Sequence, residues 1–92
     1  MMLDKVALQS LAEMKVGSVF DGVTLIEREL HDLTRWGVIY REILGHSGRF
    51  YETFYEVGAT EMQDMEPYEY EDDAIQLAEV YPVEKISYQR EL

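Results

Sequence analysis

The spacing of hydrophobic residues changes along the chain, and near the N-terminus it predicts a helix. In residues 3–14, apolar side chains recur at helical intervals, which is typical of an amphipathic helix with one face toward a core. These side chains are Leu3, Ala7, Leu11 and Met14. Gly17 follows at a position suited to ending the helix. Because a helix of this length is not stable alone in water, we expect it to pack on the rest of the domain.

A tight turn and a strand are predicted next. Asp21-Gly22 lies between two short apolar runs, and an Asp-Gly pair readily adopts the positive φ angles of a two-residue turn. Residues 23–31 are expected to form the first main strand. Residues 32–35 are expected to form the turn that follows it.

The clearest pattern is a β-hairpin. Residues 36–44 and 49–57 are rich in β-branched and aromatic side chains and flank the sequence GHSG at 45–48. Symmetric closure about a four-residue loop brings apolar side chains together and opposite charges together. The expected pairs are Ile39 with Phe54, Arg41 with Glu52 and Ile43 with Phe50 on one face, and Trp36 with Val57, Val38 with Tyr55 and Tyr40 with Thr53 on the other.

Both faces of this hairpin are therefore apolar, whereas a sheet with one solvated face alternates apolar with polar residues. The N-terminal helix can cover only one face. The other face must be covered by the C-terminal residues, by the acidic segment described below, or by another subunit. A homodimer is one expectation that follows.

The C-terminal residues complete the predicted fold. Residues 74–78 are expected to be helical or extended, and residues 79–90 to form an edge strand, because Pro82 cannot donate a hydrogen bond to a sheet. The predicted class is α+β in a single domain, residues 1–92. A short N-terminal helix packs on an antiparallel three- or four-stranded sheet, with a long acidic loop before the last strand.

The chain carries a formal net charge of −11, which is concentrated beyond its midpoint. Residues 1–51 hold six Lys or Arg against seven Asp or Glu, whereas residues 52–92 hold two against twelve. Direct binding to nucleic acid is disfavoured, because it depends on Lys and Arg displacing counterions from phosphates. The expected complement is a basic protein surface. With 47% hydrophobic residues, the chain still has the material for a core.

Residues 58–73, GATEMQDMEPYEYEDD, contain no Lys or Arg and are called the acidic segment here. Methionines, a proline and two tyrosines are interleaved with its carboxylates, which suits an ordered loop whose apolar side chains pack inward. The alternative is a solvated stretch that only keeps the protein soluble. An ordered segment would offer a fixed array of negative charge to a basic partner. The predicted partner-binding residues are Glu61, Asp64, Glu66, Tyr68, Glu69, Tyr70, Glu71, Asp72 and Asp73.

Other chemistry has little support in the sequence. The chain has no cysteine, and His31 and His46 lack the spacing of zinc ligands. The acidic segment lacks the alternating acids and central glycine of an EF-hand loop, and no glycine-rich phosphate-binding motif occurs. We therefore predict a protein that is not an enzyme and has no cofactor and no metal site. Trp36 beside Arg35 has a composition that is frequent in binding hot spots, but the favoured interpretation is a core tryptophan with solvated arginines.

The sequence also bears on location. There is no apolar signal-peptide core near the N-terminus, and no run approaches the length of about 18 apolar residues needed to span a bilayer. We expect no membrane association and a cytoplasmic location.

Three stretches carry a resemblance to a known group of proteins. They are FDGVTL at 20–25, GATEMQDMEPYEYED at 58–72 and EVYPVEKISY at 79–88. The chain resembles small proteins encoded by bacteriophages and prophages, with a similar GATE-Q-D-P-EYE centre and EV-PVEK end. It departs from them at Tyr68, where a tryptophan often follows the proline. The resemblance implies a phage accessory protein acting inside a bacterial cell, and it carries over no catalytic residue and no mechanism.

Two functions from different classes are consistent with the sequence. In the first, the protein binds and inhibits a basic host protein, such as a nucleic-acid-binding or defence factor, through its acidic C-terminal half, which imitates a nucleic acid. In the second, it is a homo-oligomeric structural or assembly module of phage origin, and the acidic segment only maintains solubility.

Overall fold

The computed structural model describes residues 1–58, 66–83 and 88. Most of these residues lie in β-strands, and one short helix is present among them. The elements in chain order are β1 (Met2–Asp4), α1 (Lys5–Ala12), β2 (Val19–Phe20), β3 (Val23–Leu33), β4 (Gly37–His46), β5 (Arg49–Gly58), β6 (Ala74–Gln76) and β7 (Ala78–Val80).

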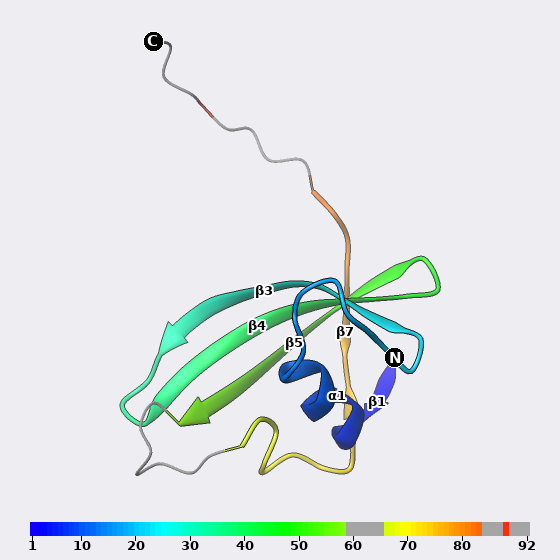
Figure 1. The fold of residues 1–92 in the computed structure, drawn as a ribbon. Helices are drawn as coiled ribbons and strands as arrows, with labels where there is room; N and C mark the ends of the chain where they lie inside the picture. The colour runs from blue at the N-terminus through cyan, green and yellow to red at the C-terminus, as the bar shows by residue number, and fades with distance from the viewer. Residues whose placement is uncertain (59–65, 84–87, 89–92) are drawn as a thin grey trace.

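The strands form two antiparallel sheets. The main sheet has five strands in the order β2-β3-β4-β5-β7, and β1 pairs with β6 in a separate two-stranded sheet. Figure 1 shows β3, β4 and β5 side by side, with α1 and β1 beneath one end of this layer. The predicted class, a short N-terminal helix packed on an antiparallel sheet, is confirmed. The sheet has more strands than the three or four expected, because β2 and β7 are short additions to the edges of three long strands.

The ends of the chain differ from the prediction in detail. The predicted helix at 3–14 is shorter, because residues Met2–Asp4 pair with β6 and place Leu3 opposite Ile75. The predicted strand at 79–90 begins as β7, which lies at the sheet edge and ends before Pro82, and residues 84–87, 89 and 90 of the prediction lie outside the described residues. The long acidic loop is not confirmed, since residues 59–65 lie outside the described residues. Residues 66–73 form a turn that leads into β6.

The Asp21-Gly22 turn is confirmed and joins β2 to β3. Its two residues have φ angles of 53° and 78°, the left-handed conformation that the Asp-Gly pair favours. Strand β3 continues to Leu33, through part of the stretch predicted as a turn. Its pairing with β4 is irregular on either side of Ile26 and again between Leu30 and Asp32. Such irregularities bend a strand and increase its local twist.

The hairpin is present, but its loop and register differ from the prediction. The loop consists of Ser47 and Gly48 alone, with φ angles of 51° and 77°. Two-residue turns of this kind match the twist of the flanking strands better than a symmetric four-residue loop does. The register is therefore shifted by two residues, so that Val38 pairs with Val57 and Tyr40 with Tyr55. A shift of two leaves every side chain on its predicted face.

One face of the main sheet carries the core. Leu8 and Leu11 of α1 pack on side chains from β3, β4 and β5, and Tyr68 of the acidic segment and Leu77 complete the cluster. Its buried members are Leu8, Leu11, Val23, Leu25, Leu44, Tyr51, Tyr55, Tyr68 and Leu77. The helix thus covers one face, as expected.

The opposite face is only partly covered by the described residues. Ile43 is buried there, but Ile26 and Phe54 are exposed. Arg41 crosses this face between Glu29 and Glu52, with N–O distances of 3.0 and 2.5 Å. The interpretation of Trp36 as a core residue is wrong, since its side chain is 56% exposed and the Arg35 guanidinium lies 5.1 Å from its ring centroid.

Among the described residues, the one helix is too short and too polar to cross a membrane.

Candidate functional site

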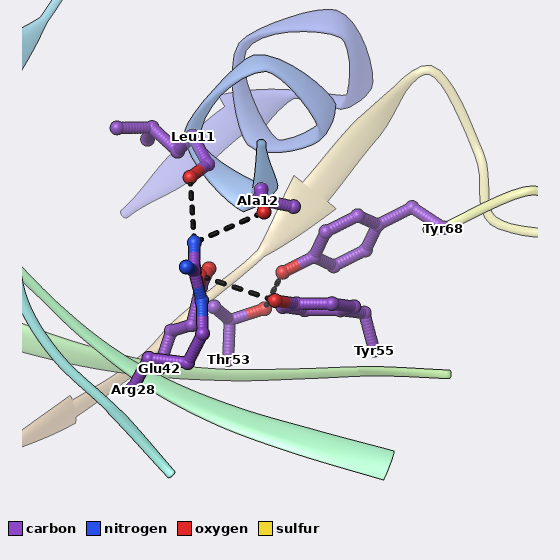
Figure 2. A network of polar contacts seen from close by, with 7 residues as sticks. All are labelled: Leu11, Ala12, Arg28, Glu42, Thr53, Tyr55 and Tyr68. Atoms are coloured by element: carbon purple, nitrogen blue, oxygen red, sulfur yellow. Dashed lines mark hydrogen bonds and ion pairs between the residues drawn. The ribbon is translucent and has the colours of Figure 1, made fainter. Parts of the chain in front are cut away.

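Tyr68 anchors the described part of the acidic segment, residues 66–73, to the sheet. Its side chain is 5% exposed, and its hydroxyl lies 2.8 Å from Thr53 Oγ1 of β5 (Figure 2). Its ring packs beside Tyr55, with centroids 5.4 Å apart. Tyr68 has φ 60°, a conformation that costs about 1–2 kcal/mol for a residue with a side chain. The burial and the hydrogen bond hold the residue in this conformation.

Helix α1 holds the backbone of the same residues. The Lys5 ammonium donates to the carbonyls of Glu69 and Glu71, at 3.0 and 3.3 Å. The Lys5 amide donates to the carbonyl of Asp73 at 2.7 Å, and Gln9 Nε2 donates to the carbonyl of Pro67 at 3.0 Å. These bonds satisfy backbone carbonyls rather than carboxylates. Residues 66–73 are therefore fixed to the helix while their acidic groups stay available.

The predicted partner-binding residues differ in their exposure to solvent. Glu66, Tyr70, Glu71, Asp72 and Asp73 are exposed, and Tyr70 is the most accessible of the tyrosines in the segment at 87%. Glu69 is half-buried, and Tyr68 belongs to the core. Glu61 and Asp64 lie outside the described residues.

The acidic groups of residues 66–73 are not neutralised by cations in the part of the chain that the structure describes. The ion pairs found there join Arg28 to Glu42, Arg41 to Glu29 and Glu52, and Arg49 to Glu79. Exposed carboxylates without an ion-pair partner produce a negative potential that extends about 8–10 Å into physiological salt. The described part of the acidic segment, together with the nearby Glu56, is the candidate functional site.

A pocket of about 250 Å³ lies within this site, between β5 and residues 66–71. Its walls include Phe54 and Tyr55, and Glu56, Glu66 and Glu71 also line it. No three His, Asp or Glu side chains among the described residues are arranged to hold a metal ion. The pocket therefore combines aromatic walls with dispersed negative charge.

A buried ionic network contacts Tyr55, which lines the pocket. Glu42 projects from β4 into the core with its side chain 0% exposed, and Glu42 Oε2 accepts hydrogen bonds from Arg28 at 2.8 Å and from Tyr55 at 3.4 Å (Figure 2). Arg28 also donates to the carbonyls of Leu11 and Ala12, at 2.9 and 3.0 Å. The guanidinium thus links the end of α1 to the sheet.

The surroundings of this network shift the pKa values of its members. Burial raises the pKa of the Glu42 carboxyl, and the hydrogen bond from Arg28 opposes that rise only in part. Burial also raises the pKa of Tyr55 to about 12, and the nearby Glu42 carboxylate adds to the shift. Glu42 Oε1 has no hydrogen-bond partner among the described residues. Because Glu42 Oε1 is buried without a partner, the Glu42 carboxylate depends on Arg28 as its one strong hydrogen-bond donor. Loss of Arg28 should therefore lower the stability of the protein.

Sequence reasoning missed this network, although a signal for it exists. Glu42 interrupts the face of β4 that carries Val38, Tyr40 and Leu44, and a lone acid on an apolar face needs a partner. Its partner, Arg28, could not be named from the sequence, because the irregular β3–β4 pairing determines which residue lies opposite.

Replacing Tyr68 with phenylalanine is expected to lower the free energy of unfolding by about 1–2 kcal/mol, because Thr53 Oγ1 loses its partner in a buried position. The loss should also alter the pH dependence. Burial raises the pKa of Tyr68 above its ordinary value of 10, so the folded state holds this proton more tightly than the unfolded state does. The free energy of unfolding of the wild type should therefore fall as pH rises above 10, and less steeply in the variant.

Urea unfolding at neutral pH and above pH 10 measures both effects. Tyr70→Phe is the matched control, since its exposed hydroxyl should contribute less than about 0.5 kcal/mol at neutral pH. Equal stabilities of the Tyr68 and Tyr70 variants would show that the Tyr68 hydroxyl does not anchor the segment.

Comparison with known proteins gives no match to any protein family, any curated protein or any solved structure.

Proposed function

We propose that this protein is a non-enzymatic binding protein that attaches to a basic surface of another protein through the exposed carboxylates of the acidic segment. One observation carries the proposal. Residues 66–73 are held by hydrogen bonds to their backbone and by the buried Tyr68, while their carboxylates have no ion-pair partner among the described residues. A charged surface that is already ordered loses little conformational entropy when it binds.

The partner is proposed to be a host protein that itself binds nucleic acid, or a defence factor with a similarly basic site. A fixed series of carboxylates competes with phosphates for Lys and Arg, so occupation of the site would inhibit the partner. Complementary charge mainly raises the association rate and suppresses wrong partners. The resemblance to bacteriophage proteins adds the proposal that the chain is a phage accessory protein acting in the bacterial cytoplasm.

The test compares two variants of equal charge. One neutralises four exposed acids of the segment, and the other neutralises four exposed acids elsewhere. The segment variant is Glu66→Gln, Glu71→Gln, Asp72→Asn and Asp73→Asn. The control variant is Glu13→Gln, Asp21→Asn, Glu27→Gln and Asp32→Asn.

Each immobilised protein is exposed to a bacterial lysate, and the captured protein is purified for affinity measurements at increasing salt. We expect the wild type and the control to capture the same basic protein, and the segment variant to bind it at least about tenfold more weakly. The wild-type affinity should fall steeply as salt rises. Equal capture by all three proteins, or an affinity independent of salt, would refute the proposal.

A second candidate function is a homo-oligomeric assembly module, favoured by the surface of β3. Leu30 and Leu33 are exposed, and among the described residues β2 pairs only with Val23 and Thr24 of this strand. Exposed strand edges with apolar side chains invite pairing with another chain. Light scattering on the same preparations separates the candidates, since a stable monomer at high concentration would exclude the assembly module.

A further inference from the structure

We propose that the pocket beside β5 receives a single lysine or arginine side chain of the basic partner. This inference rests on the proposed function and names the contact through which the partner is recognised. The pocket, of about 250 Å³, lies against the first residues of the described acidic segment. It is thus part of the surface where the negative charge is displayed.

The walls of the pocket suit the aliphatic stem of such a side chain. Phe54 and Tyr55 of β5, Ile39 of β4, and Tyr68 and Tyr70 of the acidic segment line it. Long cationic side chains bury their methylene groups against apolar surface and keep the charged end near polar groups. Aromatic faces add an attraction for the cation of about 0.5–2 kcal/mol, which an isolated acidic surface lacks.

The polar part of the lining suits the charged end. Glu56, Glu66, Glu69 and Glu71 contribute to the pocket, and none of the described residues that line it is Lys or Arg. Glu69 Oε2 is shielded from solvent and has no hydrogen-bond partner among the described residues. A carboxylate oxygen without a donor is costly, and rotation of the Glu69 side chain toward the pocket would let an incoming ammonium or guanidinium group supply that donor.

Lys5, which contacts the acidic segment, is already engaged. The Lys5 ammonium is bonded to the carbonyls of Glu69 and Glu71, and not to their carboxylates. Glu56 is partly satisfied, since its Oε1 accepts a hydrogen bond from Thr34 at 3.0 Å. Negative charge therefore remains in excess around the pocket.

An organic cation fits this arrangement better than a metal ion does. A metal ion needs several oxygen ligands at about 2.0–2.6 Å from one point, and the described carboxylates do not converge in this way.

The pocket is also accessible to an extended partner. Strand β4 pairs with one edge of β5 along Phe54–Glu56, but β7 pairs with the other edge only at Phe50–Glu52, so the described residues place no strand on that second edge beside Phe54–Glu56.

The test uses short peptides that are uncharged apart from one central residue, which is lysine, arginine or, as the neutral control, norleucine. Norleucine has an aliphatic stem like that of lysine but no charge. Binding is followed by NMR shifts of the protein at physiological salt. Two variants remove two charges each. Glu66→Gln with Glu71→Gln alters the pocket, and Asp72→Asn with Asp73→Asn alters the acidic segment outside the pocket.

We expect the lysine or arginine peptide to bind at least about tenfold more tightly than the norleucine peptide, with shifts at the pocket residues. The pocket variant should lose at least about fivefold in affinity, and the variant outside the pocket less than about twofold, because screening weakens distant charges. Equal losses in both variants would overturn the pocket and leave the general charge attraction in place. No charge-dependent binding by the wild type would overturn the pocket, while capture of a basic protein in the lysate experiment would still support the proposed function.

Discussion

Replacing Arg28 with methionine is expected to lower the free energy of unfolding by about 3–5 kcal/mol. The substitution leaves the carboxylate of Glu42, which is 0% exposed, without a cation and with only the long hydrogen bond from Tyr55. It also removes the two hydrogen bonds to the carbonyls of Leu11 and Ala12 at the end of α1. For a domain whose whole stability is of the order of 5–15 kcal/mol, this is a severe loss.

The pH dependence identifies the cause. Without Arg28, the pKa of Glu42 is raised by burial with little opposition, so the folded state holds the carboxyl proton more tightly than the unfolded state does. The loss of stability should therefore be smaller near pH 4.5 and larger at neutral pH. Urea unfolding at the two pH values measures it.

The double variant Arg28→Met, Glu42→Leu is the control for the ionic network. Replacing a whole buried ion pair with apolar residues is often neutral, whereas removing one partner is not. We expect the double variant to recover most of the lost free energy. A double variant as unstable as Arg28→Met alone would show that the packing of Arg28 and its hydrogen bonds to the end of α1, and not the charge of Glu42, account for the loss.

Replacing Leu11 with alanine is expected to lower the free energy of unfolding by about 2–5 kcal/mol, through lost burial and the cavity left behind. Leu11 is fully buried between α1 and the sheet. Val6→Ala is the matched control on the same helix, because Val6 is 69% exposed and its replacement should change the stability by less than about 0.5 kcal/mol. Thermal unfolding of both variants measures the difference.

This prediction also bears on function, because α1 holds the acidic segment. Lys5 and Gln9 lie on the same helix and bind the carbonyls of Pro67, Glu69 and Glu71. Loosening α1 should therefore increase hydrogen exchange at the amide of Glu71, which donates to the carbonyl of Tyr68. Unchanged exchange at Glu71 in a destabilised Leu11 variant would show that the segment is ordered independently of the helix.

Much of the fold follows from local sequence patterns. The Asp21-Gly22 turn, the short helix and the two faces of the hairpin could be predicted because each depends on a short repeat or a specific turn pair. The hairpin register could not, since loops of two and four residues place the same side chains on the same faces. The pairing of β1 with β6 was missed because its partner lies far away in the chain.

The candidate site, too, could be predicted from the sequence only in part. The excess of negative charge follows from the composition, and its place in the chain follows from the order of the residues. The different environments of Tyr68 and Tyr70 could not, because both residues alternate with acids, and only the contact with Thr53 shows which one is buried. The role of Lys5 was also hidden, since a lysine that binds carbonyls looks in sequence like any solvated lysine.

The central claim is that the acidic segment, held in place by the fold, is the surface that binds a basic partner. The most direct test is an NMR titration of the labelled protein with the captured partner, because it maps the contact residue by residue. We predict that the amide shifts concentrate at residues 66–73 and at Phe54–Glu56, and that they disappear at high salt. Shifts centred on the exposed surface of β3, or shifts that persist unchanged at high salt, would contradict the claim.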